Sequence, residues 1–230
     1  MSLQFILGNS GSGKSSFLYQ KVIEESMAHP MENYLILVPE QFTMQTQKEL
    51  VSLHPKHAIM NIDVLSFNRL AFRVFDELGK TDFVVLEETG KNLVLRKVAG
   101  EKKKELPVLG ANLKKMGYIS EVKSLLSEFM QYNVTPEMLE ELTGEGKTSS
   151  FSYKMRDVLT MYRGFLDYVE GTYITAEEIL DLLAELADDS ALLRGSTLVF
   201  DGFTGFTPNQ NKLLTVLFPL VKDVLVTVSM

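Results

Sequence analysis

Short apolar segments alternate with longer amphipathic ones along the chain. Five of the short segments are rich in Ile, Leu, Val and Phe and mostly do not alternate with polar residues: 3–7, 34–38, 59–65, 197–200 and 223–228. Continuous apolar runs of this length are typical of parallel strands that are covered on both faces of a sheet. The pattern therefore predicts an α/β fold with a parallel sheet.

Between these segments, apolar residues recur at helical spacing. One stripe comprises Ile119, Val122, Leu125, Leu126 and Phe129, and a second comprises Val158, Leu159, Tyr162, Phe165, Leu166 and Val169. Each stripe predicts a helix that buries one face. Capping-box patterns at Thr175 with Glu178, and at Thr207 with Gln210, predict two further helix starts.

The predicted strands lie at the two ends of the chain, and a mostly helical stretch separates the third from the fourth. This order predicts a discontinuous core, residues 1–84 and 194–230, with a helical insertion at 85–193. The last predicted strand ends within two residues of the C-terminus. We therefore expect the chain to be a fragment of a longer protein.

The amino-acid composition limits the class of protein and the kinds of metal or disulfide site that the chain can form. Hydrophobic residues make up 45% and charged residues 23% of the 230 residues, which is typical of a globular protein. The absence of cysteine excludes disulfides and thiolate metal sites, and three histidines leave little for metal binding. Neither a signal peptide nor a run of about 18 apolar residues is present. We expect a cytoplasmic protein that does not cross a membrane.

Charge is unevenly distributed. The net charge of −7 argues against a uniformly basic nucleic-acid binder. Residues 91–123 nevertheless carry nine basic and three acidic groups, whereas residues 124–193 carry four basic and fourteen acidic groups. The basic block either faces phosphate or is a solvated helix face, and the sequence leaves both interpretations open.

A glycine-rich motif follows the first predicted strand and precedes a helical pattern. It reads Gly8-Asn-Ser-Gly-Ser-Gly-Lys-Ser15, a complete G-x-x-x-x-G-K-S sequence. Glycines let successive backbone N–H groups turn inward around phosphate oxygens, the lysine neutralises phosphate charge, and the serine hydroxyl binds Mg²⁺. The motif predicts nucleotide binding by Gly8, Gly11, Ser12, Gly13, Lys14, Ser15 and Ser16.

A carboxylate ends the fourth predicted strand, in Leu-Val-Phe-Asp201. In phosphate-loop proteins an Asp at this place holds Mg²⁺ opposite the loop serine. We expect Ser15 and Asp201 to form the metal site. Hydrolysis also needs a group that activates water, often a Glu directly after this Asp, and here that residue is Gly202. The sequence therefore predicts nucleotide binding with weak hydrolysis or none.

Several motifs together resemble superfamily 1 DNA helicases, and in particular the AddB family, the second subunits of bacterial AddAB helicase-nucleases. They are the phosphate loop, VPEQFT from Val38, VLSFNRLAFRVF from Val64, and VFDGFTGFTP from Val199. The similarity spans the whole chain but only the N-terminal part of an AddB subunit. Two helicase carboxylates are replaced by Gly202 and Gly205, and the motifs of the second motor domain are absent.

The resemblance implies a RecA-like core that binds ATP and Mg²⁺, an AddA-type partner subunit, and a role in double-strand break repair with DNA tracking and Chi recognition. In the intact parent it also implies a nuclease and an iron-sulfur cluster, both outside this chain. Candidate residues on the DNA path are Gln41, Thr43, Ser66, Phe67 and Arg69, which could equally be packing residues. The basic residues Lys91, Arg96, Lys97, Lys102, Lys103, Lys104, Lys114 and Lys115 would contact DNA phosphates.

Two other functions fit the phosphate loop. A small-molecule kinase would also use Lys14, with the basic segment from Arg96 to Lys104 as a lid, but its acceptor carboxylate would have to be Glu40. Alternatively, the nucleotide site only stabilises the fold. No catalytic residue is assigned.

Overall fold

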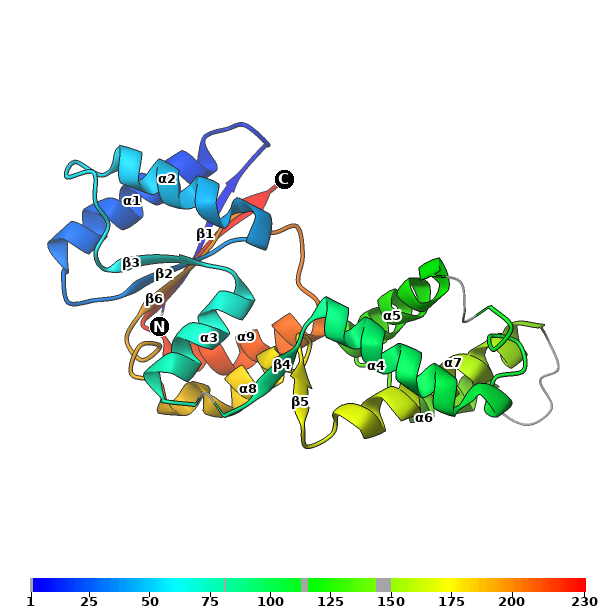
Figure 1. Cartoon of the computed structure of the whole chain (residues 1–230). Coiled ribbons are helices and arrows are strands. Elements are labelled where there is room, and N and C mark those ends of the chain that lie inside the picture. The colour runs from blue at the N-terminus through cyan, green and yellow to red at the C-terminus, as the bar shows by residue number, and fades with distance from the viewer. Residues whose placement is uncertain (1, 81, 113–115, 144–149) are drawn as a thin grey trace. The chain divides into compact units, whose positions relative to one another are not determined.

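The computed structural model describes residues 2–80, 82–112, 116–143 and 150–230 (Figure 1). The chain divides into two compact units. The first, called the sheet unit, comprises residues 1–81 and 180–230, and the second, called the helical unit, comprises residues 82–179.

Residues 180–193 therefore group with the sheet unit, whereas the sequence placed them in the insertion. Tertiary contacts account for the difference. The Glu77 carboxylate accepts hydrogen bonds from the Ser190 hydroxyl (2.5 Å) and the Leu192 backbone N–H (2.8 Å). In addition, Lys212 forms an ion pair with Asp181 (2.5 Å). These partners are far apart in sequence, so the local pattern could not reveal them.

Within the described residues, five parallel strands form the sheet, in the order β1-β7-β6-β2-β3. Their bounds are β1 Ser2–Gly8, β2 Tyr34–Leu37, β3 Ile62–Leu65, β6 Thr197–Phe200 and β7 Asp223–Ser229. The predicted α/β fold with a parallel sheet is confirmed. The third strand is shorter than predicted, because the chain bends at Met60 and Asn61 and the strand begins only at Ile62.

Helices cover both faces of the sheet (Figure 1). On one face lie α1 (Lys14–Ala28) and α2 (Thr43–Leu53), whose apolar side chains pack against a core that includes Ile36, Val199 and Leu225. On the other face lie α3 (Phe67–Glu77), α8 (Ile179–Leu186) and α9 (Pro208–Leu220). The capping box predicted at Thr207 and Gln210 is present at the start of α9.

Parallel strands end at the same edge of a sheet, and this places the sequence motifs together. The glycine-rich motif follows β1, the segment from Val38 follows β2, Ser66 follows β3, and Asp201 follows β6. The carboxyl edge of the sheet therefore carries all the candidate residues except the basic segment.

The helical unit contains α4 (Glu88–Glu101), α5 (Met116–Gln131), α6 (Pro136–Thr143) and α7 (Ser150–Val169). The two predicted apolar stripes lie on α5 and α7 and face a common core. Two three-residue strands, β4 (Val84–Leu86) and β5 (Tyr173–Thr175), pair in parallel and were not predicted. They are too short to carry a recognisable apolar run.

The predicted DNA contact at Lys91 is wrong. Its side chain is only 1% exposed, and its ammonium group donates to both carboxylate oxygens of Glu177 (2.9 and 2.8 Å) and to the Ser127 hydroxyl (3.3 Å). A buried ammonium group needs such partners to offset its lost hydration. Lys91 therefore holds α4 to the segment before α8, and it is not available to DNA.

In the part of the chain that the structure describes, no helix is both long enough and apolar enough to span a membrane.

Candidate functional site

The glycine-rich turn joins β1 directly to α1. Gly11 and Gly13 adopt left-handed backbone conformations, with φ of 76° and 86°, which favour glycine because a Cβ would be strained there. At Gly8 the space is tight rather than the backbone strained, since a Cβ would lie 2.6 Å from the Ser12 hydroxyl oxygen and the Ser12 side chain would have to turn away. Because α1 begins at Lys14, the turn places backbone N–H groups and a helix N-terminus where an anion would be favoured.

Lys14 folds back over the turn. Its ammonium group donates to the carbonyl oxygens of Gly8 (2.9 Å) and Asn9 (2.8 Å). A phosphate in the turn would offer a charged acceptor in place of these carbonyls. Lys14 is therefore already positioned over the turn that would receive the phosphate.

Asp201 lies beside this turn and is 6% exposed. One carboxylate oxygen accepts from the hydroxyls of Ser15 (3.1 Å) and Thr227 (2.6 Å), and the other accepts from the Tyr19 hydroxyl (2.7 Å). The structure thus brings the two predicted metal ligands together and adds two hydroxyls that the sequence did not predict.

The donor set suits Mg²⁺. Hydroxyl, carboxylate and water oxygens are its preferred ligands, and it is bound by few protein groups together with phosphate oxygens. In the described ranges, no group of three or more His, Asp or Glu side chains could hold a metal ion by itself. Ser15 and Asp201 could contribute two ligands to such an ion if phosphate oxygens and water supplied the others.

Tyr19 is a buried partner of the carboxylate. Burial, and then its hydrogen bond to Asp201, hold the pKa of its phenol well above the usual value of a tyrosine. The hydroxyl therefore stays protonated near neutral pH and acts as a donor to Asp201. The sequence contained no signal for this role, because Tyr19 occupies an ordinary core position on α1.

A cavity of about 220 Å³ adjoins this carboxylate and is called the small cavity here. Its wall includes Ser15, Tyr19 and Asp201 on one side and Gln45, Thr46 and Glu49 of α2 on the other. Sequence reasoning missed Gln45 and Glu49, which reach the site only because α2 packs beside α1.

Gly202, which also lines the small cavity, has a φ of 76°. The residue that follows Asp201 is thus in a left-handed conformation that a glutamate would adopt only with strain. The backbone here does not suit the carboxylate that helicases carry at this position.

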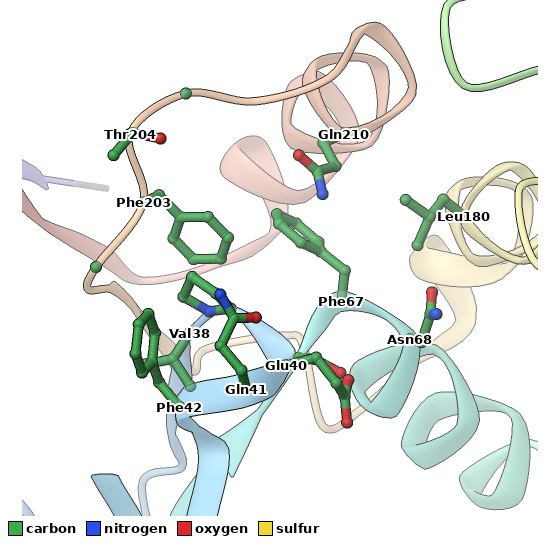
Figure 2. Close-up of a pocket in the computed structure, with 14 residues that line it drawn as sticks. Val38, Glu40, Gln41, Phe42, Phe67, Asn68, Leu180, Phe203, Thr204 and Gln210 are labelled. Carbon is green, nitrogen blue, oxygen red and sulfur yellow. The ribbon is translucent and has the colours of Figure 1, made fainter. Parts of the chain in front are cut away.

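A second cavity of about 530 Å³, called the large cavity, lies at the same edge of the sheet (Figure 2). Its lining comes from the ends of three strands: Val38–Phe42 after β2, Ser66–Asn68 after β3, and Gly202–Gly205 after β6. Val38, Phe42 and Gly202 line both cavities. The two sites therefore share part of one wall.

The five candidate DNA residues differ in position. Gln41, Ser66 and Phe67 line the large cavity. Gln41 is exposed, whereas Ser66 caps α3 by accepting from the backbone N–H of Arg69 (3.4 Å) and Phe67 is 5% exposed.

The other two candidates do not line the cavity. Thr43 is buried and donates to the Glu40 carbonyl (3.0 Å). Arg69 is exposed and pairs with the Glu40 carboxylate (3.2 Å). Both residues thus hold the Glu40 segment, which forms part of the cavity wall.

Aromatic rings form the floor of the large cavity. The Phe67 ring lies 5.6 Å from that of Phe203 and 6.1 Å from that of Phe206, both in edge-to-face geometry. Figure 2 shows Phe67 and Phe203 close together, with Gln41 and Gln210 on opposite sides of them. The cavity thus combines aromatic surface with side-chain amides.

In the helical unit, part of the basic run lies near the end of α4. Arg96 and Lys103 line a hollow of about 470 Å³, and Lys97 stacks over the Tyr168 ring at 4.6 Å. Lys102 pairs with Glu105 (3.4 Å). Lys114 and Lys115 lie outside the described residues.

Comparison with known proteins identifies relatives across the whole chain. Proteins named as the B subunit of an ATP-dependent helicase/deoxyribonuclease match it in Lachnoclostridium phytofermentans (49% identical over 100% of this chain), Clostridium tetani (34% over 99%) and Clostridioides difficile (31% over 100%). The chain spans about 20% of the length of each of these relatives.

The sequence profile of a family described as "ADDB, N-terminal" matches residues 5–230, which is nearly the entire chain and includes every motif at the carboxyl edge of the sheet. The chain therefore belongs to the ADDB N-terminal family.

Proposed function

We propose that this chain is the nucleotide-binding and DNA-holding part of a helicase-nuclease subunit that acts in DNA double-strand break repair. Family membership and the printed names of its relatives support the subunit assignment. The subunit would work with an AddA-type partner. Its nuclease and iron-sulfur cluster would lie in the four-fifths of the relatives' length that this chain does not span.

The nucleotide site rests on one observation above all. The Ser15 hydroxyl and the Asp201 carboxylate are 3.1 Å apart although they are 186 residues apart in sequence. This proximity of a loop serine and a strand-end carboxylate at a parallel sheet edge supports the proposal of a RecA-like phosphate-loop core, because Mg²⁺ bound to a nucleotide would need both groups. Gly8, Gly11, Ser12, Gly13, Lys14, Ser15 and Ser16 would bind ATP, which supplies the phosphate oxygens that complete the coordination of Mg²⁺.

We further propose that hydrolysis is weak or absent. Asp201 would bind the metal, and Gly202 stands where a water-activating glutamate would be expected, with a left-handed backbone that a glutamate would adopt only with strain. Glu49 of α2 lines the small cavity as well, so Glu49→Gln would test whether it contributes to any residual hydrolysis. The site would therefore serve as a nucleotide-dependent clamp.

The large cavity is the proposed path of single-stranded DNA, including recognition of Chi. Aromatic rings stack on nucleobases of any sequence, and side-chain amides hydrogen-bond to base edges. Gln41 and the half-buried Phe203 would supply these contacts. Phe67, which is buried against Phe203, would fix the cavity wall together with Thr43, Ser66 and Arg69. Arg96, Lys97 and Lys102–Lys104 of the helical unit would contact DNA phosphates.

Nucleotide titration followed by thermal unfolding tests this proposal. Mg-ATP should raise the midpoint of the wild-type chain, by about 2.7 kcal/mol of stabilisation at a hundred times the dissociation constant. Lys14→Ala should abolish most of the shift, while Lys21→Ala, which changes a half-buried lysine about two turns further along α1, should retain it.

Two results would contradict the proposal. If Mg-ATP fails to stabilise the wild-type chain, the turn is a structural element only. If ATP is rapidly split upon addition of a small metabolite and DNA has no effect on the chain, a kinase becomes the better assignment.

A further inference from the structure

The two oxygens of the Asp201 carboxylate are held by different groups. Oδ1 accepts from the hydroxyls of Ser15 (3.1 Å) and Thr227 (2.6 Å). Oδ2 accepts from the Tyr19 hydroxyl (2.7 Å), which is its only donor among the residues that the structure describes. Because the terminal torsion of an aspartate has a broad energy minimum, contacts to one oxygen alone leave the plane of the carboxylate free to turn. The contact from Tyr19 therefore fixes that plane.

Ser15 and Tyr19 reach the carboxylate from the same helix. They lie four residues apart on α1, so their side chains are neighbours on one face of the helix. One hydroxyl meets Oδ1 and the other meets Oδ2. The spacing of α1 thus places one donor on each oxygen of Asp201.

Tyr19 is itself held firmly in place. Its side chain is 3% exposed and belongs to the core beneath α1 and α2. Its hydroxyl also lies 3.4 Å from the Thr46 hydroxyl of α2. A donor that packing holds in place can keep a functional carboxylate in one orientation.

Metal binding would affect the two α1 contacts differently. In the proposed site the Ser15 hydroxyl oxygen would become a ligand of Mg²⁺, so its hydrogen bond to Asp201 would change. The Tyr19 contact is on the other oxygen and would persist. The orientation of Asp201 beside the ion would then depend on Tyr19 and Thr227.

We propose that Tyr19 is a positioning residue of the metal site, which orients the Asp201 carboxylate for a divalent cation bound together with a nucleotide. Tyr19 would touch neither the ion nor the nucleotide. This role rests on the proposed nucleotide function, and it adds a residue that the glycine-rich motif does not contain.

Two effects of the Tyr19 hydroxyl oppose each other. As a donor it draws negative charge from the carboxylate, which weakens the attraction for a cation. As a fixed contact it removes the cost of orienting the carboxylate when the ion binds. Loss of a hydrogen bond to a metal ligand typically lowers metal affinity about 10–100-fold, so the second effect is expected to dominate. Because Thr227 would still hold Oδ1, we expect the lower end of this range for Tyr19→Phe.

Isothermal titration of the full chain with ATP, once with Mg²⁺ and once with EDTA, tests the proposal. The ratio of the dissociation constant in EDTA to that in Mg²⁺ measures how much the ion contributes to nucleotide binding. Tyr19→Phe should lower this ratio about tenfold. It should leave the dissociation constant in EDTA unchanged, because the glycine-rich turn and Lys14 are intact.

Tyr162→Phe is the matched control. It removes another buried tyrosine hydroxyl, which donates to the Val134 carbonyl in the helical unit (3.2 Å), and it should leave the ratio unchanged. An unchanged or higher ratio for Tyr19→Phe, or an equal fall for Tyr162→Phe, would overturn the proposal. Thermal unfolding shows that each variant is folded at the temperature of the titration. If Mg²⁺ does not strengthen ATP binding to the wild type, the nucleotide-bound metal site itself is refuted, and this role of Tyr19 with it.

Nuclear magnetic resonance gives a second measurement that needs no substitution. In a chain with labelled tyrosine, the hydroxyl proton of Tyr19 should exchange slowly with water both without and with Mg-ATP, because it is buried and hydrogen-bonded in both states. Rapid exchange once Mg-ATP is bound would show that the contact breaks when the ion arrives, and it would overturn the proposal.

Discussion

The hydroxyl of Tyr19 offers a direct test of how Asp201 is held. Tyr19→Phe removes a 2.7 Å hydrogen bond to a buried carboxylate and leaves the ring in place. Hydrogen bonds to charged groups contribute about 1.5–3 kcal/mol. Because Ser15 and Thr227 still donate to Asp201 in the variant, we expect the lower part of this range, about 1.5–2 kcal/mol. For a chain of this length that corresponds to a fall of about 3–8 °C in the thermal midpoint.

A double-mutant cycle separates this bond from other effects of the substitution. The midpoint and the urea dependence of unfolding are measured for the wild type, Tyr19→Phe, Asp201→Asn and the double variant at neutral pH. If the bond acts as described, Tyr19→Phe costs at least about 1 kcal/mol less in the Asp201→Asn background than in the wild type. Additive effects of the two substitutions would refute this account of the site.

Four further predictions follow from particular contacts. Lys91→Met should lower the free energy of unfolding by about 3–5 kcal/mol in urea titrations, because it leaves Glu177 buried without its partner, and adding Glu177→Leu should recover part of the loss. Gly202→Glu should lower the free energy of unfolding by about 1–2 kcal/mol and should not confer ATP hydrolysis, because the backbone at this position is left-handed. Gly205→Glu should lower it less, because this position is open and its backbone is not left-handed. Rapid ATP hydrolysis by the Gly202 variant would show that only the glutamate side chain was missing. Burial raises the pKa of Tyr34 and of Tyr162 to about 12, so the folded chain favours the protonated forms of both phenols. The stability that they contribute is complete below pH 10 and is lost as the pH rises from 10 to 12. Tyr34→Phe should make the fall in stability with rising pH less steep, and an unchanged slope would contradict this account. Replacing Lys102, Lys103 and Lys104 together by Gln in the intact complex should weaken DNA binding and reduce its salt slope by about 0.7–0.9 per phosphate contact; an unchanged affinity and slope would assign these residues to a solvated face.

Much of the sheet could be predicted because its strands are continuous apolar runs. The runs at 34–38 and 197–200 became fully buried central strands. The predicted run at 59–65 began too early, since the chain bends at Met60 and Asn61 and pairs with β2 only from Ile62. β4 and β5 escaped prediction because three residues cannot establish a period.

The parts of the candidate site that lie within short, continuous sequence motifs could be predicted. The glycine-rich turn and Asp201 belong to such motifs, and the structure brings Ser15 and Asp201 within hydrogen-bond distance. Tyr19, Thr227 and Glu49 join them only through packing of elements distant in sequence. The same limit explains the error at Lys91, whose partner Glu177 is 86 residues away. A local charge count cannot distinguish a lysine in solvent from one in a buried pair.

The wall that Val38, Phe42 and Gly202 share has a thermodynamic consequence. A ligand that shifts the Phe42 ring in one cavity would change the shape of the other, so we expect the two occupancies to be linked. By reciprocity, the factor by which nucleotide changes the affinity for a DNA strand equals the factor by which that strand changes the affinity for nucleotide. One pair of titrations, each ligand with and without the other, therefore measures the linkage twice, and Phe42→Ala should reduce both factors equally.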